Sequence, residues 1–258
     1  MRARPVLPPV TPEPADWSAP SYASLTASGY PQPARSPRRV AGLGTVTQLL
    51  LTAQLLASIA LLFPVLHQRR LIDRAGDHPG SVTAGAARSA DHAVAAFADT
   101  VTALFLVTGL IWLVWFFRAR MNVTAWSPMY QRYAPDWAIW SWLCPVVSLW
   151  FPYAITRDVL DDTEHPPGRS PATRPGRPML LAWWIGYALL QLLWVLEQTL
   201  QKSGSISELG LHSNLQLAIV VVRIVSVSLA IVVVRQLTEA QTERIDDARP
   251  SGQALLAG

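Results

Sequence analysis

Four long apolar segments dominate the pattern along the chain, and stretches rich in charged residues and proline separate them. The segments cover residues 40–66, 100–117, 178–196 and 210–234. The first three contain no Asp, Glu, Lys or Arg, and the fourth contains a single one, Arg223. About twenty such residues in a helix cross the hydrocarbon core of a bilayer. The pattern therefore predicts an all-α, polytopic membrane helix bundle with four spanning helices.

A fifth apolar stretch, residues 137–156, is also free of charged side chains and leaves a five-span alternative open. Pro145 and Pro152 interrupt this stretch, and each removes a helical hydrogen bond. A hairpin that enters and leaves on one face gathers most of the Arg and Lys residues on that side, whereas five spans divide them almost equally. We therefore expect a proline-broken re-entrant or interfacial hairpin beside four spans.

The tryptophans support the same topology, because indole rings favour the headgroup level of a bilayer. In the four-span arrangement, nine of them fall near the inner face: Trp112, Trp115, Trp126, Trp137, Trp140, Trp142, Trp150, Trp183 and Trp184.

Three regions follow along the chain. Residues 1–39 contain nine prolines and no apolar run, so we expect a disordered cytoplasmic tail. Residues 40–236 form the membrane bundle, and residues 237–258 form a short cytoplasmic helical extension and a disordered tail. Because the first apolar segment is too long for a signal peptide, it is expected to be an uncleaved anchor in the plasma membrane.

Composition agrees with this assignment and excludes some functions. Hydrophobic residues make up 51% of the chain, charged residues 15%, and the mean hydropathy is +0.25. The net charge of +4 comes from basic residues that flank the spans, so we expect no nucleic-acid partner. The single cysteine, Cys144, cannot form an internal disulfide.

From Trp115 to Tyr153, the chain reads W-F-F-R-A-R-M-N, then Y-A-P-D-W-A, then P-V-V-S-L-W-F-P-Y. This resembles the bacterial membrane-protein family called domain of unknown function 4328, in which an Arg-x-Arg-x-Asn stretch after a span precedes a Leu-Trp-x-Pro-Tyr stretch. The matching positions are Arg118, Arg120, Asn122, Pro135, Trp137, Ala138, Pro145, Leu149, Trp150, Pro152 and Tyr153. The resemblance implies a multi-span architecture and carries no established activity.

Arg223 lies near the middle of the last span, where such a residue normally faces the bundle interior and a partner. At about 1.5 Å per residue, Arg223 lies about 18 Å from the inner boundary, Gln191 about 21 Å and Gln54 about 22 Å. Asp99 is the first choice of counter-ion and Glu197 the second. These five residues would form a polar layer suited to a substrate or proton path. The alternative is a buried pair that fixes helix register, or an arginine that snorkels.

At the inner face, Arg118, Arg120 and Asn122 end the second span. They would anchor an anionic lipid or the carbonyl groups of the hairpin, or else act as ordinary positive-inside flanking residues. The histidines and carboxylates of the loops lack the compact spacing of a zinc site, so we expect no metal and no cofactor.

Three functions stay open at this level. The first is a non-enzymatic scaffold or regulator of a membrane partner, with the proline-rich tail as a docking strand. The second is a small transporter or channel whose path passes Arg223. The third is an enzyme that acts on lipid through the acidic run around Asp161 and Asp162, although no catalytic motif supports an enzyme.

Overall fold

The computed structural model describes residues 37–78, 80–126, 132–144, 146–164, 176–200 and 206–247. The described residues form helices and no strand, as predicted. The α-helices are α2 (Ala41–Asp77), α3 (Ala84–Trp126), α4 (Trp137–Leu143), α5 (Phe151–Glu164), α6 (Gly176–Leu200) and α7 (Ile206–Asp247). A single 3-10 turn, η2 (Val147–Leu149), separates α4 from α5. Residues 1–36 of the predicted disordered tail 1–39, and residues 248–258 of the predicted C-terminal extension and tail 237–258, lie outside the described residues.

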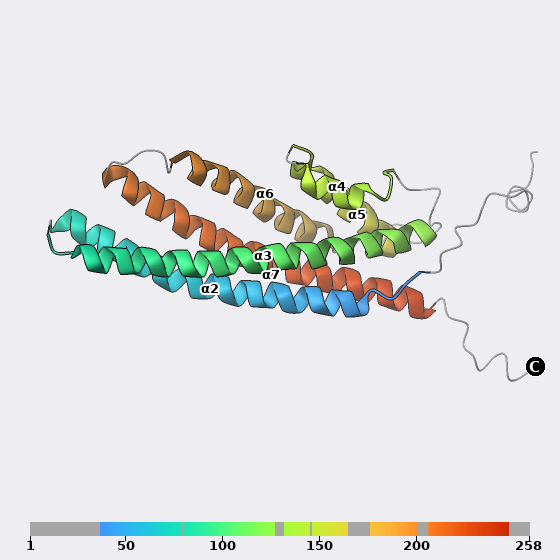
Figure 1. Cartoon of the computed structure of the whole chain (residues 1–258). Coiled ribbons are helices and arrows are strands. Elements are labelled where there is room, and N and C mark those ends of the chain that lie inside the picture. The colour runs from blue at the N-terminus through green and yellow to red at the C-terminus, as the bar shows by residue number, and fades with distance from the viewer. Residues whose placement is uncertain are drawn as a thin grey trace, which may run out of the picture. The chain divides into compact units, whose positions relative to one another are not determined.

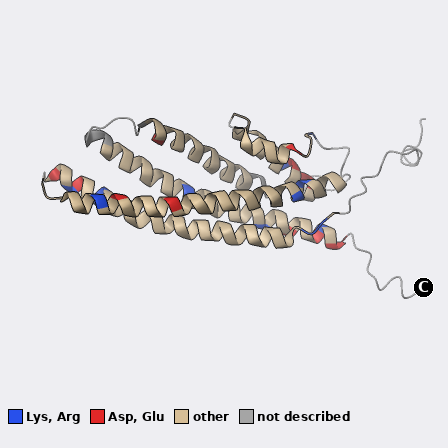
Figure 2. Ribbon diagram, in the orientation of Figure 1, with Lys and Arg blue, Asp and Glu red and all other residues tan. Residues whose placement is uncertain are grey.

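Four of these helices, α2, α3, α6 and α7, are long and apolar enough to cross a membrane, which confirms the predicted set of spans. Three of them are much longer than their apolar segments. The 43 residues of α3, for example, extend over about 64 Å at about 1.5 Å per residue, roughly twice the hydrocarbon core. The long helices therefore continue past the apolar region at their ends, where the ribbon in Figure 2 is coloured for most of the charged residues.

The four long helices run alongside one another (Figure 1), with α2 packed against both α3 and α7, and α7 also packed against α6. Helix α3 also reaches α6, because the ring centroids of Trp112 and Trp183 lie 5.4 Å apart. We call the end that holds the start of α2, the end of α3 and the end of α7 the proximal end. The opposite, distal end holds the turn from α2 to α3, where Gly80 adopts a left-handed φ of 88° that favours glycine. The described chain thus begins and ends at the same end of the bundle.

Small residues permit close approach of α7 to its two neighbours. A methyl group on Gly44 of α2 would lie 2.4 Å from Oγ1 of Thr238, and one on Gly186 of α6 would lie 3.2 Å from Cβ of Ser226. Small residues play this role in membrane helix pairs, because packing and hydrogen bonding replace the hydrophobic driving force. The indole Nε1 of Trp115 on α3 donates to the same Thr238 hydroxyl at 3.2 Å.

The fifth apolar stretch does not form a span, because it is divided among α4, η2 and α5, each far shorter than a bilayer-crossing helix. Contacts along the segment trace its path. Arg120 near the proximal end of α3 holds the carbonyl of Tyr133, and Trp142 at the end of α4 contacts Trp112, about two turns deeper in the bundle. Thr163 then returns to the proximal level.

We call residues 133–163 the re-entrant hairpin, because both ends lie at the proximal end and the turn lies deeper (Figure 1). The five-span alternative is not realised. Pro152 lies in the first turn of α5, where its missing N–H has no helical partner to lose. Pro145 lies outside the described residues.

Candidate functional site

A buried network of amides joins four parts of the chain at the proximal end. The side chain of Asn122 on α3 accepts a hydrogen bond from the main-chain N–H of Arg38 at 2.8 Å and donates to the Arg38 carbonyl at 2.9 Å. It also donates to Oε1 of Gln241 on α7 at 3.0 Å. Gln241 in turn donates to the Ala119 carbonyl at 3.0 Å and to Thr163 Oγ1 of α5 at 3.3 Å. We call Asn122, Gln241 and Thr163 the proximal junction.

The three side chains of the proximal junction are buried, and both amide groups are satisfied by these bonds. A saturated buried network favours one arrangement, because any displacement leaves a polar group unpaired in a low-dielectric interior. The junction therefore fixes the start of α2, the end of α3, the end of the hairpin and the end of α7 relative to one another.

Arg120 lies beside this junction and is almost completely enclosed, with 1% of its surface exposed. Its Nη2 atom donates to the Tyr133 carbonyl at 2.7 Å, whereas Nε and Nη1 have no hydrogen-bond partner among the described residues. Asp158 and Asp162 of α5 attract the guanidinium electrostatically. Arg120 thus anchors the first segment of the hairpin through its carbonyl.

Burial raises the pKa of the Asp158 carboxyl, and this effect outweighs the attraction of Arg132, Arg157 and Arg120, which lowers it. Arg157 forms an ion pair with Asp158 at 3.7 Å. The Asp158 carboxylate therefore has cations around it, but these do not fully offset the free-energy cost of removing its charge from water.

The end of α7 is held by further contacts. Arg244 lies over the Trp126 ring at 4.3 Å and donates to the main-chain carbonyls of Asp162 and Thr163. Arg39, just before α2, pairs with Asp246 at 2.9 Å across the exposed surface. These contacts extend the junction and keep both ends of the described chain together.

An aromatic cluster fastens the deep part of the hairpin. The ring of Trp142 lies between α3 and α6, with ring centroids 5.7–6.4 Å from its neighbours. The neighbours are Trp112 and Phe116 of α3 and Trp183, Trp184 and Tyr187 of α6. Tilted and edge-on aromatic pairs of this kind add to area burial. Trp142 therefore connects two spanning helices through the hairpin.

The residues of the expected mid-membrane polar layer are divided among different helices. Arg223 is half-buried on α7, and the carboxylate that attracts it electrostatically is Glu197 of α6. Gln191 donates to the Tyr187 hydroxyl within α6 at 3.2 Å. Gln54 of α2 is buried and donates to the Val101 carbonyl of α3 at 3.4 Å.

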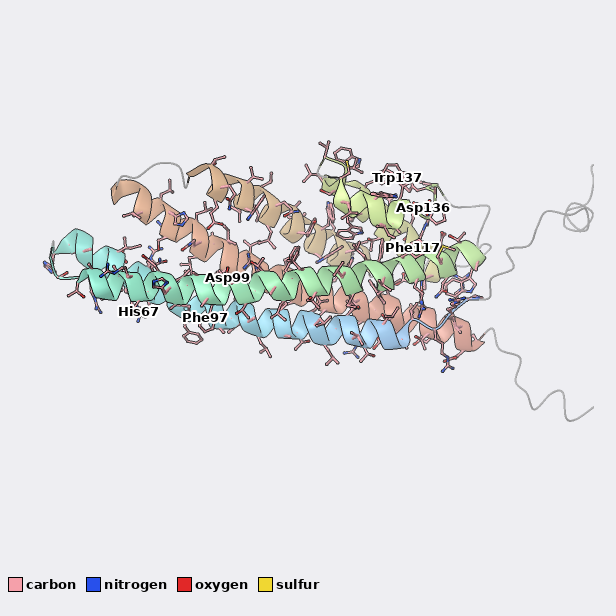
Figure 3. The ribbon with its side chains drawn as sticks, viewed as in Figure 1. His67, Phe97, Asp99, Phe117, Asp136 and Trp137 are labelled. Atoms are coloured by element: carbon pink, nitrogen blue, oxygen red, sulfur yellow. The ribbon has the colours of Figure 1, made fainter. Side chains whose placement is uncertain are left out.

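Asp99 is exposed on α3, where Figure 3 labels it. The buried Val94 and Val101 and the partly buried Ala98 lie on another face of the same helix. The second choice of counter-ion, Glu197, is thus the one that the fold brings near Arg223.

The positions that carry the family resemblance gather around the hairpin. Arg120 bonds the hairpin at Tyr133, and Asn122 bonds Arg38 just before α2. Arg118 is half-buried, four residues before Asn122 on the same helix. Trp137 is the first residue of α4, Pro135 lies two residues before it, and Pro152 lies in the first turn of α5. Trp150 is exposed at the turn into α5, and Tyr153 packs on Trp184 with centroids 6.2 Å apart.

Sequence reasoning missed Gln241, which accepts a hydrogen bond from Asn122, and Thr163, which accepts one from Gln241. Gln241 lies seven residues beyond the last apolar segment, in a stretch read only as a helical extension. Gln241 is a polar residue among charged ones, so the pattern of hydrophobic and polar positions does not indicate that its side chain is buried. A pairing across 119 positions can be read only from the fold.

Together these features define a multi-pass helical membrane protein with four spanning helices and a re-entrant hairpin locked at one end. The model of the family described as Domain of unknown function (DUF4328) matches residues 78–239, more than half of the chain. The chain belongs to this family. Comparison with curated proteins and with solved structures finds no match.

Proposed function

We propose that this protein is a non-enzymatic scaffold or regulator of a partner in the plasma membrane. The observation that supports the proposal is the pair of hydrogen bonds between the Asn122 side chain and the main-chain N–H and C=O of Arg38. It fixes the position from which the N-terminal segment leaves the bundle. A proline-rich segment held at a constant point suits docking, because polyproline conformations lose little entropy on binding.

The distribution of basic residues supports a cytoplasmic proximal end, where Arg38, Arg39, Arg118 and Arg120 flank the apolar segments. In this orientation, the N-terminal segment and the end of α7 both face the cytoplasm. A soluble domain or the cytoplasmic face of another membrane protein could then bind them.

Deletion of residues 1–36 tests the proposal. We expect the variant to insert and to unfold at the temperature of the full chain, because Arg38 and the junction are retained. It should lose the proteins that cross-link to the full chain in intact cells, measured by quantitative mass spectrometry after purification in mild detergent. Deletion of residues 248–258, at the same end of the bundle, is the matched control and should retain those proteins. An unchanged partner set after deletion of residues 1–36 would refute the docking role.

A second function is supported by Arg223, a half-buried cation in the middle of a spanning helix, with Glu197 on the neighbouring helix. Charges at this depth normally line a path or face a partner. In this alternative, the protein is a small transporter or channel for an anion or a proton.

Chloride and proton flux into proteoliposomes, followed with fluorescent indicators, tests this alternative. If Arg223 lines the path, Arg223→Leu abolishes a flux that the unaltered protein supports, because no cation remains at that depth in α7. Arg223→Lys keeps the charge and should retain part of the flux. Equal flux through the Arg223→Leu variant would eliminate the path.

A further inference from the structure

The outward face of the re-entrant hairpin is apolar and aromatic. From residue 137 to residue 156 the chain contains no Asp, Glu, Lys or Arg. The exposed side chains of this face are Trp137, Trp140, Leu143, Val146, Leu149 and Trp150. We call these six residues the hairpin face. Contiguous exposed apolar surface of this kind marks an interaction site and not ordinary solvent-exposed surface.

Charged residues flank the hairpin face at its proximal side only. Asp136 is exposed just before α4, as labelled in Figure 3, and Arg157 and Asp158 follow in α5. The turn between α4 and α5, with the exposed Cys144, has no charged neighbour in sequence. The hairpin is therefore charged at its proximal base and apolar at its deeper turn.

The contacts of Trp142 place the turn below the proximal boundary of the apolar region. Its partner Trp112 lies six residues before Arg118, which is about 9 Å along a helix at about 1.5 Å per residue. Its partner Trp183 lies five residues after Pro178, where the third apolar segment begins. Both spans are apolar at this level, so the turn lies beside their hydrocarbon-facing parts.

The hairpin face also continues the exposed apolar surface of those spans. Leu110 and Val114 of α3 flank Trp112 in sequence and are exposed, as are Leu181 and Ile185 of α6 beside Trp183. Side chains of this type on spanning helices contact acyl chains. The same environment therefore extends from the two helices over the hairpin.

We infer that the hairpin face is a lipid-contact surface, immersed among the acyl chains of the proximal leaflet, with the turn at Cys144 near its deepest point. Three exposed indoles agree with this partner, since tryptophan favours the interfacial region of a bilayer. A protein partner within the bilayer would pack against small residues, and the face presents large ones instead. The hairpin is thus an anchor in one leaflet in addition to the four spans.

The single native cysteine permits a test on the full chain without other changes. Cys144 is labelled with a small environment-sensitive fluorophore in detergent, and the protein is reconstituted into phosphatidylcholine–phosphatidylglycerol vesicles. Quenching is measured with iodide on both sides of the membrane, with lipid carrying a nitroxide on the headgroup, and with lipid carrying it on an upper acyl carbon. The same label on Leu110→Cys, in a Cys144→Ala background, is the matched control at similar depth on α3. Asp136→Cys in that background reports the base of the hairpin.

We expect the label at Cys144 to lose more fluorescence to the acyl nitroxide than to the headgroup nitroxide and to resist iodide, like the label at Leu110→Cys. The label at Asp136→Cys should be quenched by iodide and by the headgroup nitroxide. Iodide quenching at Cys144 equal to that at Asp136→Cys would overturn the inference, because the face would then contact water. Resistance to both nitroxides, together with oxidative cross-linking of two Cys144 residues, would assign the face to a second copy of the chain and would overturn it as well.

Discussion

At the scale of single residues, Asn122 has the most consequential role, because one amide satisfies both main-chain groups of Arg38 and the carbonyl oxygen of the Gln241 side chain. No residue without an amide can replace these three bonds at once. Each buried group left unpaired costs about 1–3 kcal/mol.

We therefore predict that Asn122→Ala and Gln241→Ala each lower the midpoint of thermal unfolding, followed by intrinsic tryptophan fluorescence in detergent. The double variant should lose less than the two single losses combined, because both changes break the same bond and both affect one network. Gln68→Ala is the control, since that amide bonds Asp91 at the exposed distal surface. A loss for Gln68→Ala as large as that for Asn122→Ala would contradict the special role of the junction.

The sequence pointed to Asn122 but did not identify the charged partner of Arg223. An Arg-x-Arg-x-Asn stretch at a span end attracts attention because a neutral amide is not needed for topology. For Arg223, spacing along the helices gives the depth of each candidate partner but not its direction around the helix axis. Asp99 and Glu197 both lie at suitable depths, and only the fold distinguishes the exposed Asp99 from Glu197.

At the scale of elements, the hairpin depends on Trp142, because its ring meets five aromatic rings on two helices. Trp142 is half-buried, so its removal should cost less than the roughly 3–5 kcal/mol typical of a fully buried aromatic side chain. The neighbouring Trp140 belongs to the same helix but is exposed.

Trp142→Ala should therefore loosen the hairpin, and Trp140→Ala should not. We predict that native Cys144 in the Trp142→Ala variant reacts faster with a hydrophilic maleimide in proteoliposomes than in the unaltered protein. The Trp140→Ala variant loses one lipid-facing ring of the hairpin face but no ring contact with α3 or α6, so its rate should rise far less. Equal acceleration in both variants would mean that Trp142 does not fasten the hairpin to α3 and α6.

The spanning elements follow from the apolar pattern, whereas their full lengths do not. Residues 84–98 precede the second apolar segment and still belong to α3. This stretch is rich in alanine, the best helix former, so the helix continues although the pattern of a span has ended. The proline interruptions correctly predict the break of the fifth stretch, because a missing N–H and a steric clash oppose a continuous helix.

At the scale of the whole molecule, four spans place both ends of the described chain on one side, and the Arg39–Asp246 pair joins them there. The side itself follows only from basic residues. Most of them flank the proximal end when the hairpin returns to it.

Single cysteines in a Cys144→Ala background test this orientation. Ser170→Cys lies between α5 and α6, and Ser205→Cys lies between α6 and α7. We predict that an impermeant thiol reagent labels Ser205→Cys in intact cells and labels Ser170→Cys only after permeabilisation. Labelling in the reverse pattern would place the proximal end outside the cell, and labelling of both in intact cells would contradict the four-span arrangement.

The neighbours of each helix could not be foreseen, since several different arrangements of the four helices would bury the apolar segments equally well. Two close approaches, Gly44 to Thr238 and Gly186 to Ser226, specify the neighbours of α7. Glycines in an apolar helix suggest such contacts but do not name the partner.

The position of Trp142 between α3 and α6 also constrains biogenesis. The ribosome completes α3 and the hairpin before it produces α6, so a nascent chain that ends at Glu164 has Trp112 and Phe116 but none of the three rings that α6 supplies. Because the chain is made from its N-terminus, the ring contacts of Trp142 with α6 form only after the third span enters the bilayer. Its final docking is therefore a late, post-insertion event.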